Sequence, residues 1–236
     1  MHEPVKGGPG RRERKALATR RRVLDAAEKL FTCDGYTVTA ITAIAEAADV
    51  AVQTVYAIFG SKRAILTELL RVRVGGDDAA TPLRDREYWQ AVERETDPGL
   101  QLALLASVAT QIGGRIAALY EVMAAASGSD PEIAEMYQRQ QQARYQDQRR
   151  LAEALSRQGA LRAGLSEATA TDIMWTLASP RTYRSLVTER QWATEEYERW
   201  LAHMLASALL PEPSISQVGS DVRQPRPVQT CGTRNA

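Results

Sequence analysis

The stretch that decides the fold is Arg21–Leu70, RRVLDAAEKLFTCDGYTVTAITAIAEAADVAVQTVYAIFGSKRAILTELL. Its apolar residues recur every three to four positions, which is the spacing of one face of an α-helix. Breaks in that spacing fall at Gly35, at Asp49-Val50 and at Gly60-Ser61. Two short helices joined by a turn of three to four residues form a helix-turn-helix pattern. The sequence therefore predicts a helix-turn-helix between a longer helix from about Thr19 and a following helix.

The expected ends of these helices have simple chemical causes. Gly35 is a suitable C-cap for the first helix, and Thr39 is a suitable N-cap for the second. Asp49 takes the place of a turn glycine, which is tolerable because Asp enters the left-handed conformation more readily than most residues. Ala51 brings no side-chain oxygen to cap the third helix, at a cost of about 1 kcal/mol relative to Ser or Thr.

The ordered landmarks in this run resemble the DNA-binding domain of the tetracycline-repressor (TetR) family of bacterial regulators. They are Ala27, Phe31, Gly35-Tyr36, Thr39, Ile44-Ala45, Ala48, Val50, Thr54, Tyr56, Phe59, Lys62 and Leu66. The resemblance implies nine or ten helices, a homodimer, and a divergent C-terminal effector domain. It also implies repression of transcription that a small ligand relieves.

The third helix, residues 51–59, is the expected recognition helix. The N-terminal side chains of such a helix reach base edges in the major groove, where Gln pairs with adenine and the Thr methyl packs on thymine. Gln53 and Thr54 are the candidates there, and Thr42 is expected to point outward from the second helix. Few other side chains suit base contacts, so DNA shape is expected to add to specificity.

Three further residues are candidate backbone contacts. The resemblance gives Tyr56 and Lys62 contacts to phosphate, and the hydroxyl of Thr39 is a third candidate. Each has a plain alternative: Tyr56 as a half-buried aromatic brace, Lys62 as a solvated lysine, and Thr39 as a helix cap alone.

The charge of the chain is divided unevenly. The whole sequence has 30 basic and 29 acidic side chains, yet residues 1–75 hold 13 basic and 8 acidic ones. The rest has an acidic excess, which makes it a poor surface for DNA. We therefore expect a flexible basic arm over residues 1–13, a helix-turn-helix domain over 14–60, a helical effector-binding and dimerisation domain over 61–210, and a disordered tail over 211–236. The arm either follows DNA or stays idle in solvent.

The long C-terminal part shows helical periods without strand signals, so the predicted fold class is all-α, with nine to ten helices. Helices are expected over 85–95, 98–126, 131–159, 166–178, 181–190 and 194–210. Four of them start at capping residues, two of which precede a proline at the first helical position: Asp97, Asp130, Ser166 and Thr194.

Polar side chains interrupt the apolar stripe of the helix over 131–159. Gln140, Arg144 and Asp147 or Gln148 stand at its inward positions. Because burying such groups unpaired is costly, they indicate a cavity for a small organic ligand, or else a middle section that lies on the surface. The candidate lining is Tyr120, Met123, Tyr137, Gln140, Arg144 and Trp175, with Trp89 and Arg115 as further members. Met and aromatic residues are also ordinary core residues, and an arginine in the lining would favour an acidic ligand.

The last helices carry apolar stripes that resemble the C-terminal segments of many family members, which pair in a four-helix bundle between two subunits. The candidate interface residues are Ile173, Leu177, Tyr197, Leu201, Met204, Leu205 and Ala208. The alternative is that these residues form the core of a single chain.

Other functions have little support in the sequence. The histidines (His2, His203) and cysteines (Cys33, Cys231) form no cluster with metal-ligand spacing, and no nucleophile elbow or nucleotide-binding loop is present. We expect no catalytic residue, metal or cofactor. No signal peptide or membrane span is expected, which favours the cytoplasm.

The resulting hypothesis is a dimeric regulator that binds a palindromic operator in double-stranded DNA and, as a repressor, leaves it when a ligand binds. The alternatives are a DNA-binding regulator without a small ligand, which is constitutive or controlled by a protein partner, and an enzyme built on the helical domain.

Overall fold

The computed structural model describes residues 10–77 and 81–211, and these residues fold into helices without a strand. The helices are α1 (Arg11–Cys33), α2 (Ile41–Ala47), α3 (Val52–Phe59), α4 (Lys62–Gly75), α5 (Glu87–Arg94), α6 (Pro98–Ala126), α7 (Pro131–Arg157), α8 (Glu167–Leu177), α9 (Pro180–Tyr183) and α10 (Thr194–Leu209). A 3-10 turn at Leu83–Asp85 precedes α5, and a π-helical turn at Arg184–Glu189 follows α9. The predicted all-α class and helix number are confirmed.

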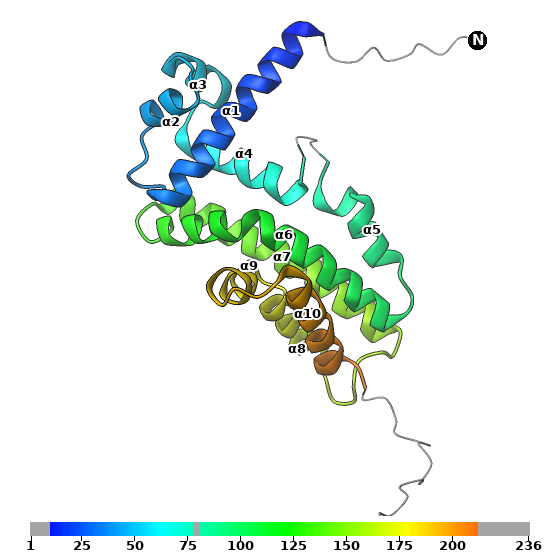
Figure 1. Cartoon of the computed structure of the whole chain (residues 1–236). Helices are drawn as coiled ribbons and strands as arrows, with labels where there is room; N and C mark the ends of the chain where they lie inside the picture. Colours follow the sequence, from blue (N-terminus) through cyan, green and yellow to red (C-terminus); the bar gives the residue numbers. More distant parts are fainter. Residues whose placement is uncertain (1–9, 78–80, 212–236) are drawn as a thin grey trace, which may run out of the picture.

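The expected boundary of the basic arm at residue 13 is wrong, because α1 already begins at Arg11. Arg11, Arg12 and Arg14 lie in an exposed first part of the helix that points away from the body (Figure 1). Arg, Lys and Ala are good helix formers, so local propensity favours the continuation of the helix through this exposed segment. Residues 1–9 of the predicted arm and residues 212–236 of the predicted tail lie outside the described residues.

Helices α1–α4 form the head of the molecule (Figure 1). Asp49 has the left-handed conformation expected of the turn, with φ of 53°. Ala51 is the N-cap of α3 and offers no side-chain hydrogen bond, whereas Ser61 accepts one from the Ala64 N–H at the start of α4. The predicted cap of α2 is wrong: Ala40 is its N-cap, and the hydroxyl of Thr39 instead donates to the Gly35 carbonyl at 2.7 Å.

The core of the head extends into the body. One cluster of buried residues joins α1–α4 to the C-terminal end of α6 and the N-terminal end of α7. From the body it includes Leu119, Tyr120, Met123, Ile133 and Met136. From α4 it includes Ile65, Leu66, Leu69 and Leu70, so α4 packs with the head although the predicted domain boundary stands before it.

Helix α6 is the central element of the body, and α1, α4, α5, α7, α9 and α10 all pack on it. Tyr183 of α9 approaches it so closely that a Cβ at Gly113 would lie 2.8 Å from the Tyr183 ring. Asp97, Asp130 and Ser166 cap α6, α7 and α8 as expected. The N-cap of α10 is Ala193 without a side-chain bond, so the prediction for Thr194 is wrong.

Helix α6 is also the one described helix that is long and apolar enough, by length and composition, to cross a membrane. Half of its apolar window is buried inside the protein. A helix that is apolar on most sides is typical of a protein core as well as of a membrane span. The packing of six helices around α6 explains its composition.

Candidate DNA-binding face and ligand cavity

The exposed face of α2 and α3 carries most of the predicted DNA contacts. The two helix axes differ by 108°, within the range of helix-turn-helix pairs. Thr42 on α2 and Gln53 on α3 are exposed, and Thr54 is partly exposed. Tyr56 keeps 51% of its surface exposed, which places the ring outside the core. These four side chains are accessible to a partner along one helix-turn-helix.

Thr39 and Lys62 lie differently from those four residues. Thr39 is 5% exposed and its hydroxyl is engaged with Gly35. The ammonium of Lys62 donates to the carbonyl oxygens of Tyr36 (2.8 Å), Thr37 (3.2 Å) and Thr39 (2.9 Å). It also lies 4.4 Å from the centre of the Tyr36 ring. Lys62 is therefore no solvated lysine, and all three of its N–H bonds are directed at the loop before α2.

Burial lowers the pKa of Lys62, because an ammonium group loses hydration there. The three carbonyl dipoles and the face of the Tyr36 ring compensate the charge. Lys62 contacts a phosphate only by giving up one of these carbonyl partners. The arrangement makes it a clip between the start of α4 and the loop that leads into α2.

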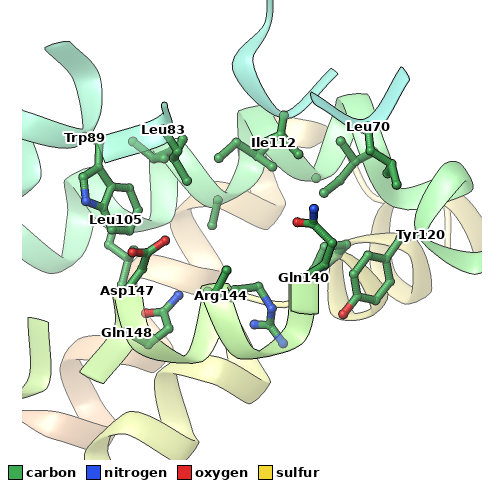
Figure 2. Close-up of a pocket in the computed structure, with 18 of the residues that line it drawn as sticks. Leu70, Leu83, Trp89, Leu105, Ile112, Tyr120, Gln140, Arg144, Asp147 and Gln148 are labelled. Atoms are coloured by element: carbon green, nitrogen blue, oxygen red, sulfur yellow. The ribbon is translucent and has the colours of Figure 1, made fainter. Parts of the chain in front are cut away.

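A cavity of about 200 Å³ lies inside the body, enclosed by α4, α5, α6 and α7. Figure 2 shows its two sides: apolar side chains above, and a row of polar side chains from α7 below. The apolar side includes Leu70, Leu83, Trp89, Leu105 and Ile112, and the polar row is Gln140, Arg144, Asp147 and Gln148. An apolar cavity with a few convergent polar groups is the usual form of a small-molecule site.

The predicted lining is found in two neighbouring cavities. Tyr120, Met123, Gln140 and Arg144 line the first, together with Trp89. Tyr137 and Trp175 instead line a second cavity of about 480 Å³, in which Tyr120 and Arg144 take part again. Tyr120 and Arg144 thus stand between the two cavities.

Arg115 does not reach either cavity. Its guanidinium donates to the carbonyl oxygens of Arg73 (2.9 Å) and Val74 (3.3 Å) at the end of α4. The sequence also gave no indication that α4 contributes Leu70 and Val74 to the first cavity. Their spacing is that of any core stripe, and only packing decides which core positions border a void.

The alternative that the middle of α7 lies on the surface is wrong for Gln148 but holds for Gln140. Gln148 is 4% exposed, and its Oε1 atom has no hydrogen-bond partner among the described residues. Gln140 is exposed at the rim. Burial raises the pKa of Asp147, whose carboxylate is paired with Arg150 one turn further on. The α7 row therefore combines buried polar groups with an open edge.

Comparison with known proteins identifies the head. Residues 23–69 match the family model of bacterial regulatory proteins of the tetR family. The helix-turn-helix head therefore matches the DNA-binding domain of the tetR family. A comparison with curated proteins gave no match.

Solved structures share the fold of this chain. The transcriptional regulator FadR from Bacillus subtilis, solved with stearoyl-CoA, is 18% identical, with a TM-score of 0.61 over 80% of this chain and 98% of that one. NalD, a repressor of a multidrug efflux pump in Pseudomonas aeruginosa, is 20% identical, with a TM-score of 0.61 over 83% and 97%. The SmeT–triclosan complex is 21% identical, with a TM-score of 0.63 over 89% and 100%. At these identities the likeness shows the fold alone.

The predicted interface residues separate into two groups. Tyr197, Leu201 and Leu205 are at most 1% exposed and pack into the core beside α6, as the single-chain alternative holds. Ile173, Leu177, Met204 and Ala208 are only partly buried and lie on α8 and α10. The apolar periodicity of α8 and α10 did not distinguish the residues that face α6 from the partly exposed residues beside them.

Proposed function

We propose that this DNA-binding regulator is a repressor that holds a palindromic operator as a homodimer and releases it when a small organic ligand occupies the body. The DNA-binding face is formed by Thr42, Gln53, Thr54 and Tyr56, with Lys62 and Thr39 acting through the loop before α2. Its place of action is the cytoplasm, where the operator is. Binding of DNA and of a small ligand requires no catalytic group, metal or cofactor.

One observation supports the ligand-controlled part of the proposal: some residues that line the cavity also belong to the core of the head. Leu70, Tyr120 and Met123 line the cavity and also belong to the buried cluster that joins α1–α4 to the body. A ligand that moves these side chains must also move the head or strain the common core. Such a ligand shifts DNA binding only to the extent that it prefers one position of the head over the other.

Contacts along α4 give that motion a route. Arg63 pairs with Glu132 at the start of α7, while Arg73 donates to Asp25 (2.9 Å) and to Glu28 on α1. The carbonyl groups at the end of α4 are held by Arg115 of α6. Displacement of α4 by a ligand therefore reaches α1 directly.

The alternative is a DNA-binding regulator without a small ligand, either constitutive or controlled by a protein partner. The apolar cavity with its polar row favours the small-ligand form, as do the ligands named in the structures of two neighbours, stearoyl-CoA and triclosan.

DNase footprinting on the DNA beside the gene of this protein tests the regulator. We expect a protected palindrome with half-sites about one DNA turn apart. Gln53→Ala is expected to weaken binding by about 1–3 kcal/mol and to relax the preference at one base pair in each half-site. Glu46→Ala, exposed on α2, is the matched control. Absence of a footprint there and in genome-wide selection would contradict the proposal.

A further inference from the structure

Arg144 is a cation inside the body that has no carboxylate partner among the described residues. It projects from the middle of α7 and borders both cavities. Burial lowers its pKa. Removing a charge from water is costly unless the charge is paired and hydrogen-bonded. The fold therefore places a positive charge without a carboxylate counter-charge among the described residues beside its two voids.

The hydrogen bonds of Arg144 are also incomplete. Its Nη1 atom donates to the Trp175 carbonyl at 2.5 Å, and the guanidinium lies 4.5 Å from the centre of the Trp175 ring. Its Nε atom is buried without a partner among the described residues. A guanidinium has five N–H bonds in a planar fork that matches a carboxylate. The described residues therefore offer this fork a carbonyl and a tyrosine hydroxyl but no anionic acceptor.

The other charged groups that line the two cavities have partners. Asp147 is paired with Arg150 on its own helix, and Arg181 lies 3.4 Å from Glu121. Tyr120 and Tyr137 are the groups that face Arg144, and burial raises the pKa of Tyr120 to about 12, so its hydroxyl is neutral near pH 7. Neither the tyrosines nor Asp147 thus supplies a negative counter-charge to Arg144.

From this geometry we infer that the ligand is an apolar acid, with its hydrocarbon body in the 200 Å³ cavity and its carboxylate against Arg144. The inference rests on the proposed ligand site and names its chemistry. Tyr137 also faces Arg144, and its hydroxyl accepts a hydrogen bond from Gln141 Nε2 at 3.3 Å. An ammonium group in that position would meet the positive charge of Arg144 and gain nothing.

Three probes that share one hydrocarbon chain and differ in the charge of their head group test the inference. They are octanoate, 1-octanol and n-octylammonium, each titrated calorimetrically into the full-length protein. We expect octanoate to bind at least about tenfold more tightly than 1-octanol, the effect of about 1.4 kcal/mol from charge-assisted hydrogen bonds, and octylammonium to bind most weakly. In Arg144→Gln the advantage of octanoate over 1-octanol falls to within about twofold, since the remaining apolar contacts are the same for both.

Arg139→Gln is the matched control, because Arg139 lies on the same helix in an exposed pair with Glu135. It is expected to leave all three affinities unchanged. Tightest binding of 1-octanol or octylammonium to the wild type overturns the acid but leaves the ligand site intact. If none of the three binds, both the acid and the ligand-controlled part of the proposed function fall. Binding of octanoate without release of operator DNA supports the acid and contradicts control by release.

Discussion

Lys62 makes contacts in the structure that differ from the role expected of it from the sequence. The resemblance gives it a phosphate contact, and the three carbonyl groups it holds give it a task inside the head. Those carbonyls lie in the loop that sets where α2 begins. Thr39, one of the three residues held, is itself buried. An indirect role in DNA binding follows, in which Lys62 positions α2 and α3.

At this scale we predict that Lys62→Met weakens operator binding without changing its salt dependence. A lysine that neutralises a phosphate contributes close to one unit to the slope of log affinity against log salt, and a lysine engaged with carbonyls contributes none. Fluorescence anisotropy at several salt concentrations measures both quantities. The same substitution is expected to lower the midpoint of urea unfolding, because three carbonyls, two of them partly buried, lose their donor.

Tyr56→Phe is the comparison variant, since it removes one exposed hydroxyl and keeps the ring. It is expected to weaken DNA binding with little effect on the free energy of unfolding. A salt slope that falls by about one unit in Lys62→Met would show that Lys62 exchanges its carbonyl partners for a phosphate.

Among the elements, α3 has the least local support. It is eight residues long, its N-cap Ala51 makes no side-chain hydrogen bond, and Val55 is its one fully buried residue. Short helices depend on packing and capping because the cost of their first turn is spread over few hydrogen bonds. The recognition helix is therefore held mainly by its neighbours.

We accordingly predict that Ala51→Ser stabilises the head. Ala51 already has the extended backbone of an N-cap, with φ of −66° and ψ of 145°, so a serine hydroxyl can accept from the free N–H groups of α3. The expected gain is about 1 kcal/mol in the free energy of unfolding, measured by urea denaturation. Ala57→Ser, on the exposed side of the same helix, is expected to give no gain, and an equal effect of both substitutions would contradict the capping argument.

Helix α4, in contrast to α3, makes contacts with other elements along its whole length. Its start holds the loop before α2, its middle borders the cavity, and its end is capped by Arg115 of α6. A helix fixed at both ends moves as a unit. For this reason α4 is suited to transmit ligand binding in the cavity to the DNA-binding head.

The whole molecule separates its tasks by charge and by packing. The basic excess lies in residues 1–75, and the acidic excess lies in the body. The body buries Tyr197, Leu201 and Leu205 against α6 and leaves Met204 and Leu177 partly exposed on α10 and α8. Partly exposed apolar residues on two neighbouring helices are suited to a second subunit.

We therefore predict that Met204→Arg converts the proposed dimer into monomers, because a charge would be buried in an apolar interface. Size-exclusion chromatography with light scattering measures the mass, and operator affinity is expected to fall with it, since two half-sites are no longer bound together. Leu100→Arg is the control, as Leu100 is 57% exposed on α6. A mass unchanged by Met204→Arg would remove this face from the interface.

The sequence by itself determined the helices, because periodic apolar residues, capping aspartates and prolines act within a few residues. It indicated the head in the same way, through Gly35, Asp49 and their spacing, whereas the exposure of Tyr56 was decided by the fold. Only the tertiary structure decided that Arg115 caps α4, that Lys62 holds a loop, that α4 borders the cavity, and that Arg144 lacks a counter-charge. Those features join residues far apart in the chain, and periodicity reports which face of a helix is apolar but not what that face meets.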